Sequence, residues 1–372
     1  MPSGSLHIVH LSVLNPVRHT RIFGKLARTQ VKLGYRVSIL AQGEEGELES
    51  KSVELIPTGI FGRMSRRRWL APFWLMPKAA ELKADAYVIH TPELLWRVPW
   101  LKRKTGAAIL YDVHENYTLN IRHGAHWPIG VRRLMSRAFS FWENRMVHRW
   151  VDGVSFAERV YAGQLGWEGS NRVVLENRAQ KDESISDVSL PQQPYLLYCG
   201  TLAEAWGLFE SIDLWEKWYP ISPIRLVIAG HSQQMELLRR LHGRIRQSPY
   251  SEEITLIGGE DYVPHQDITR LIDHCEAGLA LYHDLPQIRG KIPTRFFEFM
   301  QAGRPLIFSD QPAWKQLNEQ SPFGFPHVED MAPEDLIERI RNWQPPQLSP
   351  ADYAWESQVS AMENWLKVCL GK

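Results

Sequence analysis

A single carboxylate lies between aromatic and apolar residues in the segment KIPTRFFEFMQAGRPLIFSD. It is Glu298, and two cations, Lys291 and Arg295, lie just upstream of it. An ionised carboxylate accepts charge-assisted hydrogen bonds, and cations hold anionic groups. The alternative is that Glu298 is a surface acid on an amphipathic helix and that the two cations are merely solvated.

Polar side chains also follow apolar runs in the first half of the chain: Asn15, His90, Asp112, His114 and Glu115. Each run has the length of a buried strand, so we expect these side chains to meet in a crevice at the strand ends. The alternative, that each histidine is only a polar strand terminus, stays open. The chain has no HExxH motif and no His/Cys cluster, which argues against a structural zinc.

Strands and helices alternate twice along the chain. The expected first-half strands are 6–14, 36–42, 86–91, 107–115, 153–157 and 173–177, with a first helix over 21–33. A polar linker over 178–194 follows, and the second-half strands are 195–200, 225–230, 254–259, 277–282 and 305–310. This alternation predicts two α/β domains of parallel sheets with helices on both faces. No GxGxxG motif follows the first strand, which argues against an ordinary dinucleotide dehydrogenase.

Length and composition agree with two globular domains. The chain has 372 residues, 44% of them hydrophobic, and a formal net charge of +1. This balance carries no signature of nucleic-acid binding. Three scattered cysteines without metal-ligand spacing indicate reduced thiols. We therefore expect a cytoplasmic protein. No apolar run approaches the length that spans a bilayer.

Several motifs in a fixed order resemble the GT-B glycosyltransferases of family 4, a large class of retaining enzymes. The matching segments cover nearly the whole chain: HTRIFGKLARTQVKLGYRVSIL (19–40), ILYDVHENY (109–117), VVLENR (173–178), YCGTLAEAWGL (198–208), PTRFFEFMQAGRPLIFSD (293–310) and YAWESQVSAMENWLKV (353–368). The resemblance implies two doubly wound Rossmann-like domains that face a central cleft. We expect an acceptor-binding domain over 1–180, a nucleotide-sugar-binding domain over 181–350, and a C-terminal helix over 351–372 that returns to the first domain.

The resemblance also implies roles for individual residues. Glu298 aligns with the ribose-binding glutamate, and Arg295 would meet the donor phosphates, helped by Lys291 or Arg289. His114 would contact the transferred sugar or the acceptor, so His114 and Arg295 are the expected catalytic residues. Asn15, His90, Asp112 and Glu115 are expected on the acceptor side of the cleft. Further donor-binding residues are expected at the strand ends of the second domain, namely Gly200, Thr201, Gly230, Tyr262 and Val263.

The chain departs from the family pattern at charged positions. Gly290 stands where many members have a first glutamate, and Thr201 and Trp206 stand where they have an arginine and a lysine. In the first helix, Thr20 replaces an aspartate and follows His19. These changes leave the handling of the donor sugar open.

The resemblance implies transfer of a hexose-type sugar from a UDP- or GDP-linked donor, with retention and without a metal ion. Two alternatives remain. One is a degenerate GT-B fold kept as a binding or scaffold subunit, supported by the missing charges. The other is a nucleotide-sugar 2-epimerase, although such enzymes use several acids in the cleft.

A basic and aromatic segment suggests where the acceptor is found. FGRMSRRRWLAPFWLMPK (61–78) mixes four arginines with Trp69, Phe73 and Trp74, and a second basic-aromatic stretch covers 132–150. Such surfaces suit an anionic membrane. We therefore expect a saccharide or lipid-linked acceptor in surface polysaccharide or glycoconjugate synthesis, with peripheral binding at the inner membrane face. The alternative is that the aromatic residues pack in the core and the arginines are only solvated.

Overall fold

The chain folds into two compact units. In the computed structural model, residues 5–44, 50, 52–60, 62, 65–124, 128–180, 186, 188–328 and 331–371 are described. Unit 1 comprises Met1–Asn177 and Gln358–Lys372, and unit 2 comprises Arg178–Ser357. Among the described residues, no helix is both long enough and apolar enough to cross a bilayer.

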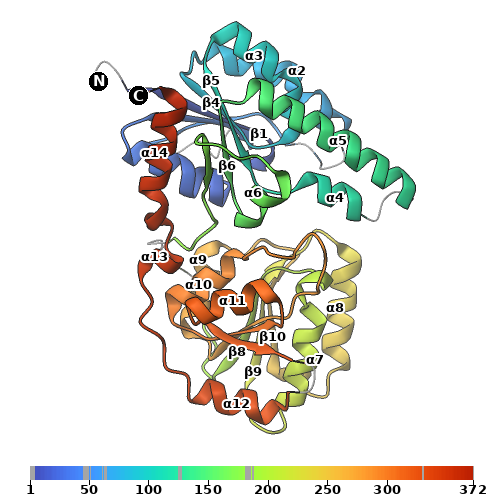
Figure 1. Cartoon of the computed structure of the whole chain (residues 1–372). Helices are drawn as coiled ribbons and strands as arrows, with labels where there is room; N and C mark the ends of the chain where they lie inside the picture. The colour runs from blue at the N-terminus through green and yellow to red at the C-terminus, as the bar shows by residue number, and fades with distance from the viewer. Residues whose placement is uncertain are drawn as a thin grey trace. The chain divides into compact units, whose positions relative to one another are not determined.

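Unit 1 contains a seven-stranded parallel sheet of order β3-β2-β1-β4-β5-β6-β7 (Figure 1). Its strands are β1 (His7–Pro16), β2 (Arg36–Gln42), β3 (Glu54–Pro57), β4 (Ala86–Ile89), β5 (Ala108–Val113), β6 (Gly153–Phe156) and β7 (Arg172–Val174). Its helices are η1 (Thr20–Ala27), α1 (Arg28–Lys32), α2 (Arg66–Glu81), η3 (Pro92–Arg97), α3 (Val98–Thr105), α4 (Tyr117–His123), α5 (Ile129–Trp150), α6 (Arg159–Leu165) and α14 (Val359–Leu370). The C-terminal helix α14 packs against β5 and β7 of the same unit.

Unit 2 contains a six-stranded parallel sheet of order β10-β9-β8-β11-β12-β13. Its strands are β8 (Tyr195–Thr201), β9 (Arg225–His231), β10 (Ile254–Gly259), β11 (Ala277–Ala280), β12 (Leu306–Ser309) and β13 (Gly324–His327). Its helices are η4 (Glu204–Trp206), α7 (Leu208–Trp218), α8 (Met235–Gln247), η5 (Ser251–Glu253), α9 (His265–His274), α10 (Thr294–Ala302), α11 (Pro312–Gln320), α12 (Pro333–Arg341), α13 (Pro350–Tyr353) and η6 (Trp355–Gln358).

Both sheets confirm the predicted doubly wound α/β fold. Strand order reverses beside the first strand of each unit, between β1 and β4 and between β8 and β11. Such a switch point opens a crevice at the carboxyl ends of the strands, where ligands bind. The sequence did not predict two of the strands, β3 and β13. Each of them lies at one edge of its sheet.

A buried carboxyl group ties α5 to the sheet of unit 1. The Tyr111 hydroxyl donates to Glu143 Oε1 at 2.9 Å, and Glu143 is almost fully buried. Burial raises the pKa of Glu143 from 4.5 to about 7, although the hydrogen bond from Tyr111 opposes the shift. The folded state therefore binds this proton more tightly than the unfolded state does, so the contribution of Glu143 to stability falls as pH rises from about 4.5 to 7.

We expect Glu143→Gln to stabilise unit 1 above pH 7 by about 3 kcal/mol, because glutamine keeps the acceptor oxygen and removes the buried charge. Near pH 4.5 the variant and the wild type should have equal stability, since both side chains are then neutral. Urea unfolding of both proteins over this pH range measures the difference. A stability difference that does not change with pH would contradict the assignment.

Candidate functional site

Strand alternation places a polar cluster on one face of the sheet in unit 1. Val9 and Leu11 of β1 belong to the apolar core of the opposite face, so His10 between them points to the face covered by η1 and α1. In the same way Asp112 lies opposite Ser155 across β5 and β6, and the Ser155 hydroxyl donates to Asp112 Oδ1 at 2.7 Å. The cluster is therefore built by the sheet itself.

Arg21 neutralises the carboxylate at the centre of this cluster. Its Nε donates to Asp112 Oδ2 at 2.9 Å and its Nη2 to Oδ1 at 2.7 Å, with both side chains buried. Its Nη1 also donates to Leu175 O and Asn177 Oδ1. Burial by itself raises the pKa of Asp112, but Arg21 and then His114 outweigh burial and hold it well below its usual value. Asp112 is thus a carboxylate that only accepts hydrogen bonds.

The structure brings His90, Asp112 and His114 together, as expected from the sequence. His114 Nε2 lies 2.7 Å from Asp112 Oδ2, and His90 Nδ1 lies 3.2 Å from the same oxygen. Because the carboxylate accepts, Nε2 of His114 carries the hydrogen, and its Nδ1 is left to take part in other interactions. His114 keeps some solvent exposure, whereas His90 is fully buried.

Behind this trio lies a chain of buried groups that the sequence analysis missed. His90 Nε2 is 2.8 Å from His10 Nδ1, and His10 Nε2 is 2.7 Å from Gln30 Oε1. Burial lowers the pKa of His10 to about 4 and that of His90 well below 6.5, so both rings are neutral near pH 7. His19 stacks on the ring of His114, and burial, with the nearby charge of His114, lowers its pKa to about 3.

Among the described residues, the same trio is the group of side chains that could bind a metal ion. Ligand atoms of His90, Asp112 and His114 lie within 4.8 Å of one another. Arg21, however, already donates to both oxygens of Asp112. A divalent cation here would have to compete with a buried guanidinium for one negative charge, which is electrostatically unfavourable.

The other two residues expected on this side lie apart from the trio. Glu115 accepts a hydrogen bond from Asn120 Nδ2 at 2.6 Å and so faces α4. The backbone N–H of Asn15 donates to Ser12 Oγ at 3.0 Å, in a part of β1 where the register shifts. Among the described residues, neither Asn15 nor Glu115 forms a hydrogen bond with the trio.

In unit 2 the carboxyl edge of the sheet is lined by glycine. Gly200 of β8 lies in register with Gly230 of β9, and Gly258 of β10 continues the row. A Cβ atom on Gly230 would overlap the carbonyl oxygen of Gly200, so only glycine fits there. Gly200 itself has φ +100°, in the left-handed region. Because the row lacks Cβ atoms, it leaves room at this edge for neighbouring backbone and for the side chain of Arg295.

Arg295 of α10 points to this glycine edge. A Cβ atom on Gly200 would overlap Nη2 of Arg295. The guanidinium lies against the rings of Tyr198 and Tyr282, with Cζ 5.6 and 5.4 Å from their centroids. Its Nη1 is buried and has no hydrogen-bond partner among the described residues. A buried donor without a partner costs about 1–3 kcal/mol, so this atom is suited to an anion that reaches it.

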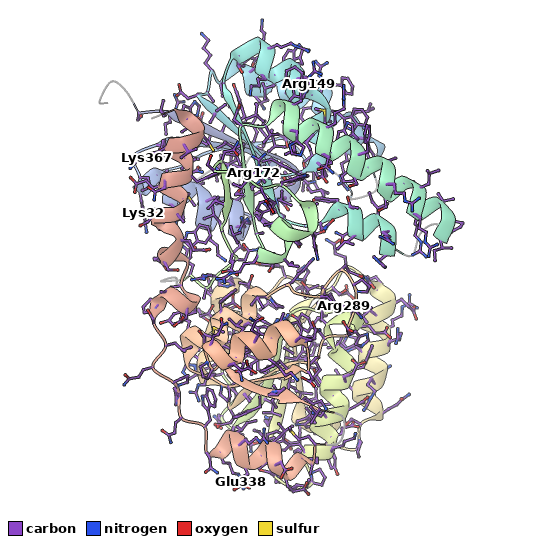
Figure 2. The ribbon with its side chains drawn as sticks, viewed as in Figure 1. Lys32, Arg149, Arg172, Arg289, Glu338 and Lys367 are labelled. Carbon is purple, nitrogen blue, oxygen red and sulfur yellow. The ribbon has the colours of Figure 1, made fainter. Side chains whose placement is uncertain are left out.

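Glu298 lies one turn further along α10 and already has a partner. Its Oε1 is 2.8 Å from Nε2 of His265, the first residue of α9, and its side chain is mostly buried. Glu298 is therefore not a surface acid of an amphipathic helix. Arg289, expected as a helper for phosphate, forms an exposed bidentate pair with Asp284 at 2.6 and 2.7 Å. Figure 2 labels the position of Arg289. Lys291 is half-buried, and its carbonyl oxygen accepts from Trp314 Nε1.

The remaining donor-side residues differ in their surroundings. Thr201 and Tyr262 are exposed, whereas the side chain of Val263 is buried in the core of unit 2 and leaves only backbone groups for a ligand. Trp206 lies at a tilt to Tyr282, with ring centroids 4.9 Å apart, and Tyr282 in turn lies against Arg295. Gly290 has φ +78°, a conformation that a glutamate would adopt only with strain.

The basic segment expected at a membrane is only partly exposed. Trp69 and Phe73 of α2 are exposed, so they do not pack in the core. Arg68, expected at the surface, is instead buried in an ion pair with Glu93. Arg63 and the side chain of Arg66 lie outside the described residues.

Two doubly wound parallel sheets, one in each unit, are the architecture of the GT-B fold. Residues 19–177 match the family described as a glycosyl transferase 4-like domain. This match covers the first part of the chain, and over its whole length the chain has the GT-B fold that the motifs predicted. No curated protein sequence matches the chain.

Solved structures share this fold at low sequence identity. A sucrose-phosphate synthase from Thermosynechococcus elongatus has a TM-score of 0.65 and 14% identity, with 98% of this chain and 97% of that chain covered. Anabaena Alr3699/HepE in complex with UDP-glucose has a TM-score of 0.62 and 13% identity, with coverage of 98% and 93%. AviGT4, a glycosyltransferase involved in avilamycin A biosynthesis, has a TM-score of 0.59 and 13% identity, with coverage of 99% of both chains.

Proposed function

We propose that the chain is a retaining glycosyltransferase that moves a hexose-type sugar from a UDP- or GDP-linked donor to a saccharide or lipid-linked acceptor. The observation that carries the proposal is the buried, unpartnered Nη1 of Arg295 beside the glycine edge of unit 2. A diphosphate would satisfy this donor, and the guanidinium would stabilise negative charge on the departing nucleotide. The structural neighbour HepE, solved with UDP-glucose, supports a nucleotide-sugar donor.

We assign recognition of the ribose to Glu298. Its carboxylate is held by His265 through Oε1, so its orientation is fixed before a ligand arrives. Ribose hydroxyls would donate charge-assisted hydrogen bonds to it. Thr201 and Tyr262 are exposed near the same strand ends and are the side chains that would meet the rest of the donor.

His114 is the group in unit 1 that we assign to the transferred sugar or the acceptor. Asp112 holds its Nε2–H, so Nδ1 can accept a proton or a hydrogen bond from a hydroxyl. Asp112 and His90 position the His114 ring and do not react themselves. Asp112 already accepts hydrogen bonds from Arg21, and His90 is already hydrogen-bonded to His10. We also propose that the protein works in the cytoplasm, at the inner face of a membrane, in surface polysaccharide or glycoconjugate synthesis.

A panel of UDP- and GDP-sugars tests the proposal. Thermal shift identifies a nucleotide that binds, and slow donor hydrolysis without acceptor then reports transferase chemistry. Binding with hydrolysis supports the enzyme. Binding without hydrolysis, even with saccharide acceptors added, would favour the scaffold subunit, for which Thr201 and Trp206 in place of cations argue. Interconversion of epimeric donors would favour a 2-epimerase.

We expect donor hydrolysis to survive EDTA. The positive charge at the donor site comes from Arg295, and the metal-ligand set of unit 1 is already neutralised by Arg21. Hydrolysis rates before and after chelation measure this directly. Loss of the reaction with EDTA and its return with manganese or magnesium would contradict a metal-independent mechanism.

A further inference from the structure

Helix α5 is attached to unit 1 by a narrow seam. Of its 22 residues, the buried ones are Ser136, Glu143 and Val147. Ser136 Oγ donates to Thr118 O in α4, and Glu143 accepts from Tyr111. Helices α4 and α5 run side by side and extend beyond the strands of their sheet (Figure 1). Most of the surface of α5 is therefore available to a partner.

The side of α5 away from this seam is apolar. Leu134 is 71% exposed and Phe141 is 72% exposed, and Val131 and Ala138 are exposed as well. Spacings of three and four residues place all four on one helix face, roughly opposite Ser136 and Glu143. Exposed large apolar residues in a continuous stripe mark an interaction surface rather than an ordinary soluble face.

The charges around this stripe have one sign. Helix α5 carries five arginines, and its only acidic residue is Glu143, whose side chain is buried. Arg137 is exposed and lies one helical turn from both Leu134 and Phe141, and Arg133, also exposed, lies one turn before Arg137. An apolar stripe flanked only by cations is complementary to an anionic lipid surface, since acyl chains take the stripe and headgroups take the arginines.

The exposed surface continues onto neighbouring elements of unit 1. Trp96 of η3 is 59% exposed and stacks on Trp142 of α5 with centroids 4.6 Å apart. The next residue, Arg97, lies over the ring of Phe73 in α2, with Cζ 5.2 Å from the centroid, and Phe73 is 57% exposed. Tryptophan side chains with one apolar and one polar edge favour the membrane interface.

We propose that α5, with η3 and the outer side of α2, forms a docking surface for an anionic lipid bilayer, and that the apolar stripe of α5 inserts between headgroups. The proposal deepens the expected membrane contact of the segments 61–78 and 132–150 by placing its centre on α5. It rests on the proposed function only in that a lipid-linked acceptor would be found at such a surface. Membrane binding itself needs no donor and no catalysis.

Vesicle co-sedimentation at low salt tests the proposal on the full chain. The wild type should bind phosphatidylglycerol vesicles, should bind phosphatidylcholine vesicles much more weakly, and should be released by salt. Leu134→Ser with Phe141→Ser should weaken binding by about tenfold or more, because large apolar side chains no longer leave water. Arg133→Glu with Arg137→Glu should weaken it by a similar factor, about tenfold.

Matched variants keep the result interpretable. Val368→Ser on α14 and Arg246→Glu on α8 change residues of the same kinds at exposed positions elsewhere, and should bind as the wild type does. Circular dichroism and the nucleotide thermal shift of each variant show that it is folded and that its donor site is intact, so failure of membrane binding is separated from failure of the proposed function. The proposal is overturned if the wild type ignores phosphatidylglycerol vesicles or if the α5 variants bind them equally well. It is also overturned if the α5 variants change only the oligomeric state, since a second copy would then cover the stripe.

Discussion

Asp112→Asn should destabilise unit 1 by about 3–5 kcal/mol, because it leaves the Arg21 guanidinium buried without its negative partner. The pair is bidentate and buried on both sides, and Arg21 also holds Leu175 O and Asn177 Oδ1. One substitution thus loosens three segments of the chain, namely η1, β5 and the residues after β7. Urea unfolding followed through unit 1 measures the loss.

An exposed pair of the same chemistry is the control. Arg289 binds Asp284 in the same bidentate way, but at the surface of unit 2. Asp284→Asn should cost at most about 1 kcal/mol, since water screens an exposed pair. Replacing both members of the buried pair, as in Asp112→Leu with Arg21→Met, should cost less than Asp112→Asn alone. Equal losses for Asp112→Asn and Asp284→Asn would refute the central role of the buried pair.

Arg295→Met should separate ligand binding from folding. Methionine keeps much of the packing between Tyr198 and Tyr282 and removes the buried donor that has no partner in the free protein. We expect the melting temperature to stay the same or rise. Affinity for the nucleoside diphosphate should fall by roughly 10- to 150-fold, the value of a charged hydrogen bond of about 1.5–3 kcal/mol.

The nearby residue Arg289 provides the comparison. It lies six residues before Arg295, ahead of the start of α10, and is exposed and paired with Asp284, so Arg289→Met should leave affinity unchanged. Calorimetric titration of both variants and the wild type decides the point. If Arg295→Met binds the nucleotide as tightly as the wild type, Arg295 does not hold the phosphates.

Strand–helix alternation was sufficient to predict both sheets, because buried parallel strands are continuous apolar runs. β2 and β10 have the predicted bounds. The two missed strands, β3 and β13, are short edge strands. β3 ends in Pro57, and β13 begins with Gly324 and contains Pro326. Proline and glycine weaken a strand pattern, yet an edge strand tolerates both because one of its sides needs no backbone partner.

The candidate site residues that could be predicted are those marked by their own neighbours in the sequence. His90, Asp112 and His114 follow apolar strands, and the structure brings them together. The partners that set their charge come from far along the chain. Arg21 is 91 residues from Asp112, and His10 is 80 residues from His90. No local pattern reports such a contact, although two histidines in the first strand and an arginine in the first helix were visible signals.

Two cations have carboxylate partners that the sequence did not reveal. Arg68 belongs to a run of three arginines that looks solvated, but helical spacing turns it toward the core, where Glu93 pairs with it. Arg289 was named beside Lys291 as a helper for the phosphates, and in the structure it pairs with Asp284, five residues before it. The sequence shows that a cation is present but leaves open whether that cation already forms an ion pair with a carboxylate.

Hydrogen–deuterium exchange with and without a saturating nucleotide, chosen from the thermal-shift panel, tests the central claim most directly. We predict protection at the glycine edge and around Arg295 and Glu298, in the segments 198–207, 229–233, 257–265 and 289–299. A hollow of about 500 Å³ lined by Phe325 and Trp343 lies elsewhere in unit 2 and should stay unchanged. Protection confined to that hollow, or no protection by any UDP- or GDP-linked compound, would contradict the assignment of a nucleotide-sugar site to the strand ends of unit 2.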